Sequence, residues 1–244
     1  MGFTVVGMSE VDEPQPTGTP TWLDLHVPNL TEAMEFYGTV FGWSYDENEL
    51  GTTCLLRGRP VAGMRVGTGG WRVHLATDDC DTTAKAVVAS GGSVVEEPHD
   101  VGDLGRAALV VDRVGATVGL WQAGTFPGCG LVNEPDTLVR NDLVTGSPGP
   151  AREFYVTVFG FTLDGNPDVD FDFTFLRRPD GHEVGGIMGL PGAPSAWHTV
   201  FEVADTDATL ASAGASVVPE DTPYGRSATF VDPFGVDLSV ITRP

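Results

Sequence analysis

Basic residues are scarce in this chain of 244 residues. Thirteen lysines and arginines stand against 34 aspartates and glutamates, Lys85 is the only lysine, and the formal net charge is −21. Such a surface repels phosphate backbones, so no nucleic acid is expected as a partner. We interpret the acidity as a feature of solubility rather than as a sign of an active site.

Cysteines, long apolar runs and common catalytic motifs are also few or missing. The three cysteines lack CxxC spacing, which favours a reduced, cytoplasmic protein. No apolar run approaches the roughly 18 residues that a membrane helix needs, and no signal peptide is evident, so no membrane contact is expected. The sequence contains no nucleophile elbow, Walker loop, Rossmann fingerprint or HExxH motif. No cofactor is therefore expected.

The chain does contain a long internal repeat. FYGTVFGW at residues 36–43 returns as FYVTVFGF at residues 154–161, 118 positions later. The segment GRAALVVDRVG at 105–115 likewise matches GRSATFVDPFG at 225–235. Repetition over such a distance indicates a duplicated structural unit.

Each copy of the repeat shows two cycles of strand, helix and further strands. Residues 22–27 alternate apolar and polar side chains, which predicts a strand. Asn29 with Glu32 predicts the start of a helix that ends at Gly42. The same strand pattern begins again at 71–77, 138–144 and 197–203. Four βαβββ units of this kind predict an α+β fold with curved mixed sheets, in the shape of half-barrels, and helices on the convex face.

This pattern predicts two domains and a linker. Residues 1–19 have little apolar pattern and are predicted to form a mobile arm. The glycines and prolines of residues 125–137 predict a linker. The predicted domains are residues 20–124, with units at about 21–67 and 71–123, and residues 138–244, with units at about 138–190 and 197–242.

Four such units, the FY…FG junctions, the VNEP segment at 132–135 and the DPFG turn at 232–235 resemble the vicinal oxygen chelate superfamily. That superfamily includes glyoxalase I, extradiol dioxygenases and bleomycin-resistance proteins. The doubled form is similar to the actinobacterial two-domain glyoxalase/bleomycin-resistance type. The resemblance covers residues 21–242 and implies the fold more strongly than the function, because one fold hosts many chemistries.

The resemblance also implies where a metal would bind. In the metalloenzymes of the superfamily, His or Glu side chains on the first and last strands of each unit hold a divalent ion. Counting back from the helix starts gives the first-strand positions Trp22, Arg72, Arg140 and His198, and the last-strand positions Gly63, Gly119, Gly186 and Ser239. Only His198 suits such an ion, so no metal ligand is predicted. A shift by two residues would give Asp24, His74, Asp142 and Val200 instead, and that alternative stays open.

Ionisable side chains recur on the face of the first strands opposite the apolar face. Buried charges are costly unless they are paired, so these residues predict either a pocket with a polar floor or internal ion pairs. The predicted catalytic residues are Asp24, His26, His74, His198 and Glu202. The predicted substrate-binding residues are Trp22, Arg72, Trp121, Arg140, Asp142 and Phe173. His99 and His182 are expected to be solvated residues of loops.

Two pairings of the units are compatible with this pattern. If the units pair in order along the chain, Asp24 and His26 share a pocket with His74. If the first unit pairs with the fourth, Asp24 and His26 meet His198 and Glu202. Either group of carboxylates and imidazoles is suited to moving protons near neutral pH.

We therefore expect a metal-independent enzyme of secondary metabolism. It would perform cyclisation, aldol-type closure, dehydration or isomerisation on a hydrophobic, aromatic, polyketide-like small molecule, because the concave faces combine aromatic walls with polar groups. One alternative is an antibiotic-binding or resistance protein without catalysis. Another is a glyoxalase- or dioxygenase-like enzyme with a divalent metal. Since the chain carries all four units, a monomer or a homodimer is expected.

Overall fold

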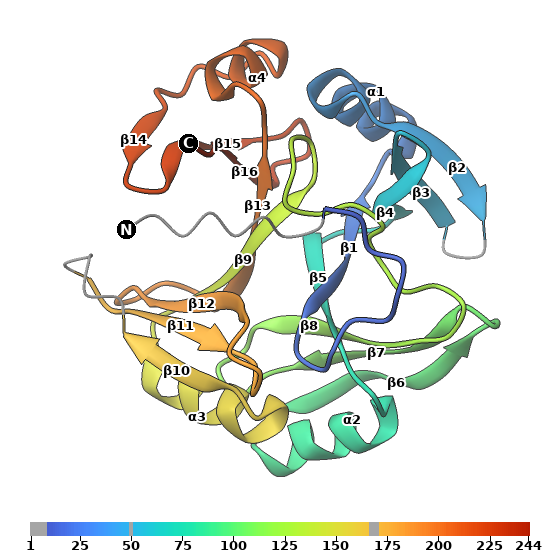
Figure 1. Ribbon diagram of the computed structural model, residues 1–244, viewed down its shortest axis with the longest axis vertical. Helices are drawn as coiled ribbons and strands as arrows, with labels where there is room; N and C mark the ends of the chain where they lie inside the picture. The colour runs from blue at the N-terminus through green and yellow to red at the C-terminus, as the bar shows by residue number, and fades with distance from the viewer. Residues whose placement is uncertain (1–8, 49–50, 166–170) are drawn as a thin grey trace.

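The first half of the protein consists of eight strands and two helices in the computed structural model, which describes residues 9–48, 51–165 and 171–244. Figure 1 shows this half in blue to green. In chain order its elements are β1 (Pro20–Val27), α1 (Leu30–Phe41), β2 (Ser44–Asn48), β3 (Gly51–Leu56), β4 (Arg59–Val66), β5 (Gly70–Ala76), α2 (Cys80–Ala89), β6 (Ser93–Val101), β7 (Gly105–Val111) and β8 (Thr117–Ala123).

The second half repeats this series of elements and is drawn in yellow to red in Figure 1. Its elements are β9 (Leu138–Thr145), α3 (Pro148–Phe159), β10 (Thr162–Gly165), β11 (Phe173–Arg177), β12 (Glu183–Gly189), β13 (Ala196–Glu202), α4 (Thr206–Ser212), β14 (Glu220–Thr222), β15 (Gly225–Val231) and β16 (Asp237–Thr242).

Each half forms one eight-stranded mixed sheet. The strand orders are β2-β3-β4-β1-β5-β8-β7-β6 and β10-β11-β12-β9-β13-β16-β15-β14, which are the same order shifted by eight strands. In each sheet the first strands of two units lie side by side and antiparallel at the centre. The α+β fold of four βαβββ units and the open half-barrel shape are thus confirmed.

The helix boundaries follow the local signals in the sequence. Before α1, the Asn29 side chain accepts a hydrogen bond from the backbone N–H of Glu32 at 3.3 Å. Gly42 ends that helix with φ 68°, a left-handed conformation that costs glycine little. Gly160 ends α3 in the same way, with φ 69°. None of the helices that the structure describes is both long and apolar enough to cross a bilayer.

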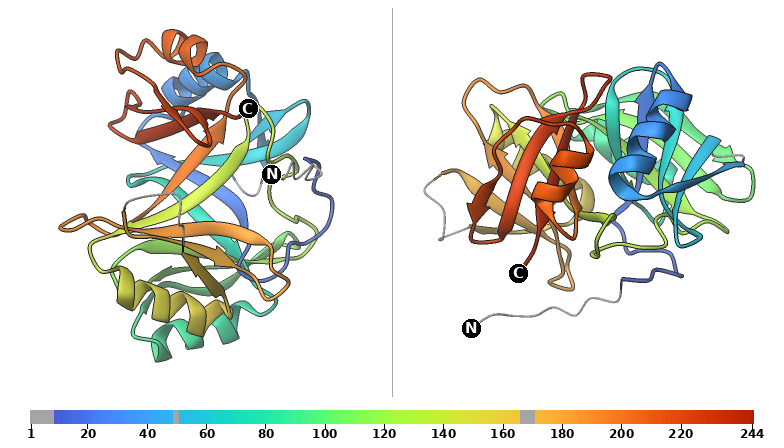
Figure 2. Two further views of the ribbon diagram at one scale, coloured as in Figure 1. Left: turned by 60° about the vertical axis from the view of Figure 1, so that its left-hand side comes forward. Right: turned by 90° about the horizontal axis from the view of Figure 1, so that it is seen from above.

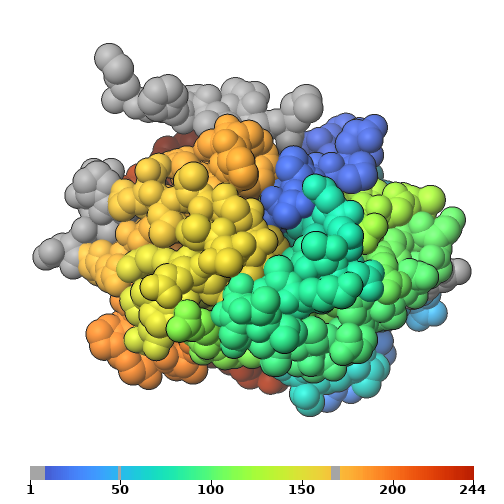
Figure 3. Space-filling model, turned by 90° about the horizontal axis from the view of Figure 1, so that it is seen from below, coloured from blue at the N-terminus to red at the C-terminus, as the bar shows by residue number. Residues whose placement is uncertain are grey.

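The helices of the two halves pack against each other. Helix α1 lies beside α4, and α2 lies beside α3, as Figures 1 and 2 show. Figure 3 shows the second pair from below, with yellow α3 next to green α2. Between the sheets, the rings of Phe41 and Trp43 lie 5.0 and 5.8 Å from the ring of Phe201. The convex faces of both sheets therefore share one apolar core.

The repeated motifs also hold the two halves together. The hydroxyl of Tyr37, in the first FY…FG segment, donates a hydrogen bond to Asp232 Oδ2 at 2.9 Å. The hydroxyl of Tyr155, in the second segment, donates to Asp112 Oδ2 at 2.8 Å. Both aspartates are buried and begin the turns of the second repeated motif. Each helix thus bonds to a turn of the other half.

The structure decides between the two pairings of units. In the sheets the units pair in order, since β1 lies against β5 and β9 lies against β13. His198 and Glu202 consequently lie on the second sheet, away from Asp24 and His26 on the first. The crossed pairing is wrong for the sheets. The first and fourth units meet instead through their helices, through aromatic side chains and through a Tyr–Asp hydrogen bond, and the second and third meet through their helices and the other Tyr–Asp hydrogen bond.

The described part of the predicted mobile arm is held by hydrogen bonds. The backbone N–H of Val11 donates to Gly130 O at 3.0 Å, and the N–H of Val132 donates to Ser9 O at 2.9 Å. Residues 9–11 therefore lie along the predicted linker, while Gly18 and Thr19 bond to the backbone of Ala76 on β5. The remainder of the predicted arm, residues 1–8, lies outside the described residues.

Candidate active site

The central strands of the first sheet supply most of the candidate residues. On β1, Asp24 and His26 alternate with Leu23 and Leu25, both of which are fully buried. Successive side chains of a strand point to opposite faces. The leucines therefore pack into the shared core, while the polar residues face the concave side. The strand register places Asp24 directly beside Arg72 of β5.

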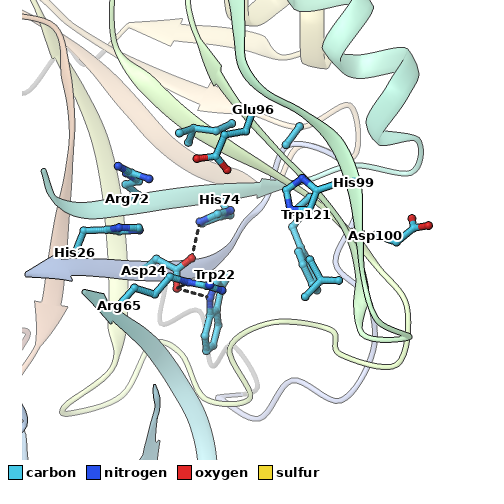
Figure 4. Close-up of a pocket in the computed structure, with 14 residues that line it drawn as sticks. Trp22, Asp24, His26, Arg65, Arg72, His74, Glu96, His99, Asp100 and Trp121 are labelled. Atoms are coloured by element: carbon cyan, nitrogen blue, oxygen red, sulfur yellow. Dashed lines mark hydrogen bonds and ion pairs between the residues drawn. The ribbon is translucent and has the colours of Figure 1, made fainter. Parts of the chain in front are cut away.

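The concave face of the first sheet holds a cavity of about 350 Å³ (Figure 4). This volume lies at the low end of the range found for small-molecule sites. All its lining residues come from strands of the first sheet. The polar and aromatic ones are Trp22, Asp24, His26, Arg65, Arg72, His74, Glu96, His99, Asp100 and Trp121.

Asp24 is the buried polar centre of the cavity floor, with only 5% of its surface exposed. Its Oδ1 accepts a hydrogen bond from Trp22 Nε1 at 3.1 Å and lies 3.7 Å from Arg65 Nε. Its Oδ2 lies 3.0 Å from His74 Nε2. Burial alone would raise the pKa of Asp24, but the contact with His74 and the charge of Arg65 outweigh it and lower this pKa. Asp24 is therefore a carboxylate at neutral pH.

Two glycines make room for this floor. A Cβ atom on Gly63 would lie 2.4 Å from Asp24 Oδ1, and one on Gly119 would lie 2.1 Å from His74 Nδ1. Any other residue at either position would displace the carboxylate or the imidazole. Both ring nitrogens of His74 are shielded from solvent, so His74 is part of the floor and does not present a nitrogen to a ligand in this conformation.

His26 and Arg72 form a more accessible part of the cavity wall. Both side chains are half-buried, and Figure 4 shows them close together on one side of the cavity. Burial and, next, the positive charge of Arg72 lower the pKa of His26 below its ordinary value. His26 is consequently a neutral imidazole at neutral pH, which can accept a proton.

Ionisable side chains on the concave face of the second sheet pair with one another. Arg140 Nε donates to Asp142 Oδ2 at 2.6 Å, and Arg140 Nη1 donates to Glu183 Oε1 at 2.7 Å. The guanidinium lies 5.5 Å from the ring centres of both Phe173 and Phe175, a cation–π distance. The predicted residues Arg140, Asp142 and Phe173 are thus brought together as an ion-pair and stacking cluster.

The remaining two predicted catalytic residues lie apart from the cavity. His198 of β13 stands beside Asp142 in the strand register. Glu202, at the end of the same strand, forms an ion pair with Arg243 near the chain terminus. The structure therefore groups six of the eleven predicted residues at one cavity, namely Trp22, Asp24, His26, Arg72, His74 and Trp121.

The strand register corrects the count of metal positions. The last-strand positions Gly63, Gly119, Gly186 and Ser239 lie beside Asp24, His74, Asp142 and Val200, respectively. The register thus selects the alternative shifted by two residues. The first count, to Trp22, Arg72, Arg140 and His198, is wrong. It measured back along the sequence from the helix starts, whereas the hydrogen-bonded register between neighbouring strands decides which residues lie side by side.

The residues at the shifted positions do not fit a metal site of this fold. The first sheet offers Asp24 and His74 with two glycines, and the two side chains contact each other directly. A structural or catalytic metal usually has at least three protein ligands. Across residues 9–48, 51–165 and 171–244, no group of three His, Cys, Asp or Glu side chains could hold a metal ion.

Four polar lining residues were absent from the predicted site. Arg65 lies two residues beyond Gly63 on β4, so strand alternation would have placed it on the concave face. Glu96, His99 and Asp100 lie on β6, where two register shifts interrupt the alternation. His99 therefore lines the cavity from a strand, and its expected place in a loop is wrong. Asp100 pairs with an arginine and points away from the cavity in Figure 4.

No protein-family model matches the chain. The chain is 38% identical to "Putative glyoxylase CFP32" of Mycobacterium bovis, covering 92% of this chain and 94% of that protein. It is 33% identical to the anthracycline biosynthesis protein DnrV of Streptomyces peucetius, covering 92% of this chain and 93% of the relative.

The fold is similar to that of solved metalloenzymes. The Mn(II)-bound glyoxalase of Novosphingobium aromaticivorans superposes with a TM-score of 0.66 at 18% identity, covering 93% of this chain and 83% of that one. At this identity the likeness shows the fold alone. The two relatives in sequence show the family.

Proposed function

This chain belongs to the actinobacterial two-domain type of the vicinal oxygen chelate superfamily, and we propose that it is a metal-independent enzyme of secondary metabolism. The proposed reaction is proton transfer on an aromatic, polyketide-like small molecule, as in cyclisation, aldol-type closure, dehydration or isomerisation. The observation that carries this proposal is the neutral His26 on the wall of a cavity floored by the Asp24–His74 pair. The identity to a protein of anthracycline biosynthesis supports the substrate class.

His26 is the proposed proton acceptor. A C–H bond next to a carbonyl would give its proton to the imidazole, and its electron pair would move to the carbonyl oxygen to form an enolate. The protonated His26 would then return the proton to a carbon or oxygen of the same ligand. A lowered pKa suits this role because the base is unprotonated at the working pH.

Asp24 and His74 are proposed to support that transfer from the floor. The fixed negative charge of Asp24 acts on His26 in the direction that raises its pKa. This charge would stabilise the imidazolium that forms when His26 takes a proton. His74 and Trp22 hold the carboxylate in place through its two oxygens.

The surroundings of Asp24 support a reaction without a metal. One carboxylate oxygen already lies near Arg65, and the other already contacts His74. Arg72 adds a further positive charge to the same cavity. A divalent cation would have to displace these groups and overcome their repulsion.

Deuterium exchange into anthrone tests the proposal. Anthrone is an aromatic ketone whose C10 protons exchange through the enol, and NMR in D₂O follows their loss. We expect the wild type to accelerate exchange and Asp24→Asn and His26→Asn each to lower the enzymatic rate about 100-fold. Glu153→Gln, on an exposed side chain of α3, is the matched control and should keep the wild-type rate.

Two outcomes would overturn the proposal. Unchanged exchange in both Asp24→Asn and His26→Asn would remove these residues from the reaction. Binding of anthrone by the wild type without any acceleration of exchange would indicate a binding protein instead of an enzyme.

A further inference from the structure

Arg72 is an exception among the arginines of this acidic protein. Every other arginine lies within 4.0 Å of a carboxylate of the described residues. No such ion pair is formed by Arg72 within the described ranges, although the chain carries a net charge of −21. An arginine without a carboxylate is therefore unusual here and calls for another partner.

Arg72 lies at the cavity, so its missing carboxylate partner bears on what the cavity binds. Its side chain is half-buried on β5 and lines the cavity beside His26 (Figure 4). Glu96 lines the same cavity from β6, yet it forms no ion pair with Arg72. The neighbouring strand position is occupied by Asp24, whose carboxylate is turned to His74 and Trp22. The guanidinium donors of Arg72 are thus available to a ligand in the cavity.

Arg65 strengthens the positive character of this region. It lines the same cavity from β4, and its Nε lies 3.7 Å from Asp24, which balances one of the two arginine charges. Arg72, beside neutral His26, is left without a carboxylate within ion-pair distance among the described residues, although Glu96 also lines the cavity. A partly buried guanidinium favours an anionic oxygen more than an exposed one does, because less solvent screens the pair.

We propose that Arg72 forms an anion subsite and that the ligand of this cavity is an aromatic molecule with an ionised oxygen acid, a carboxylate or an ionised phenol. The paired N–H donors of the guanidinium would bind the two coplanar oxygens of a carboxylate, or would both donate to the single oxygen of an ionised phenol. This inference rests on the proposed use of the cavity for an aromatic ligand. It adds that the cavity selects anions, although the protein surface as a whole is acidic.

Two matched probes test the anion subsite by isothermal titration calorimetry. Anthraquinone-2-carboxylate carries the charge, and anthraquinone-2-carboxamide has nearly the same shape without it. We expect the wild type to bind the carboxylate about tenfold more tightly than the carboxamide. Arg72→Gln should abolish this preference, and Arg72→Lys should keep part of it. Arg113→Gln, at an exposed ion pair with Glu153, should retain the full preference.

The results distinguish this inference from the proposed reaction. Equal affinity of the wild type for both probes, including no measurable binding of either, would overturn the anion subsite. A preference that survives in Arg72→Gln would overturn it as well, provided that the thermal unfolding midpoint shows a folded variant. A preference for the carboxylate in a wild type that does not accelerate anthrone exchange would leave the subsite standing and refute the proposed reaction.

Discussion

The concave faces of the two sheets have the same backbone and different contents. Asp24 and Asp142 occupy equivalent places, each on the first strand of its sheet and each beside a glycine of a neighbouring strand. In the first sheet Asp24 contacts His74 from the adjacent strand, and a cavity remains above the pair. In the second sheet Arg140 bonds to Asp142 on its own strand, and the rings of Phe173 and Phe175 lie against the guanidinium.

The difference arises from a few side chains. The position of His74 is taken by Val200 in the second sheet, and the position of His26 is taken by Val144. Because Val200 offers no imidazole at the position of His74, the carboxylate of Asp142 pairs with Arg140 of its own strand instead. The duplicated sheets therefore differ: Arg140 pairs with Asp142 and Glu183 in the second, whereas a cavity lined by His26 and Arg72 remains in the first.

The largest expected effect separates the two aspartates. Asp24→Asn should lower anthrone exchange about 100-fold because it removes the fixed charge near His26. Asp142→Asn should leave the exchange rate unchanged and weaken only the ion pair with Arg140. Parallel measurements of exchange by NMR and of unfolding in urea would check both. Equal loss of exchange in the two variants would place the second face in the reaction.

The two glycines beneath these aspartates should also respond unequally. Gly63→Ala would put a Cβ atom 2.4 Å from Asp24 Oδ1 and 3.0 Å from the buried ring of Trp22. We expect it to lower the free energy of unfolding by about 1–3 kcal/mol. Gly186→Ala would mainly meet the ring end of half-exposed Phe173, at 2.2 Å, which can rotate away. Urea denaturation would contradict this reasoning if Gly186→Ala cost more than Gly63→Ala.

Each of the two Tyr–Asp hydrogen bonds between the halves should stabilise the protein. Tyr37→Phe and Tyr155→Phe each remove a hydroxyl that donates to a buried aspartate of the other half. We expect each to lower the free energy of unfolding by about 1–2 kcal/mol, since a buried acceptor loses a partner. An unchanged free energy of unfolding in urea for either variant would show that its contact with the other half does not stabilise the protein.

The smallest expected effect is on pH dependence. A base acts when it is unprotonated, so the lowered pKa of His26 should keep anthrone exchange active below its ordinary pKa near 6.5. Arg72→Gln removes a positive charge that lowers this pKa, so the acid limb of the pH–rate profile should move to higher pH. NMR titration of the His26 ring would measure the shift directly. An acid limb that does not move would show that Arg72 does not act on His26.

Much of the fold could be predicted from local patterns. Alternation on β1 and β5, the cap at Asn29 and the glycine at 42 depend on neighbours within a few residues, and all three were predicted correctly. The position of Arg65 was also within reach of strand alternation. The bulged strand β6 was not, because two register shifts break the period that alternation needs.

The sequence by itself determined the four repeated units and which side chains of each first strand face away from the core. The internal repeat and the alternation of apolar and polar residues can be read from the sequence without knowing any tertiary contact. Only the tertiary structure decided that the units pair in order within each sheet, that Asp24 meets His74, and that Arg140 covers Asp142. These contacts depend on the register between strands and on which side chain lies close enough to pair with each carboxylate. Packing between distant segments sets both.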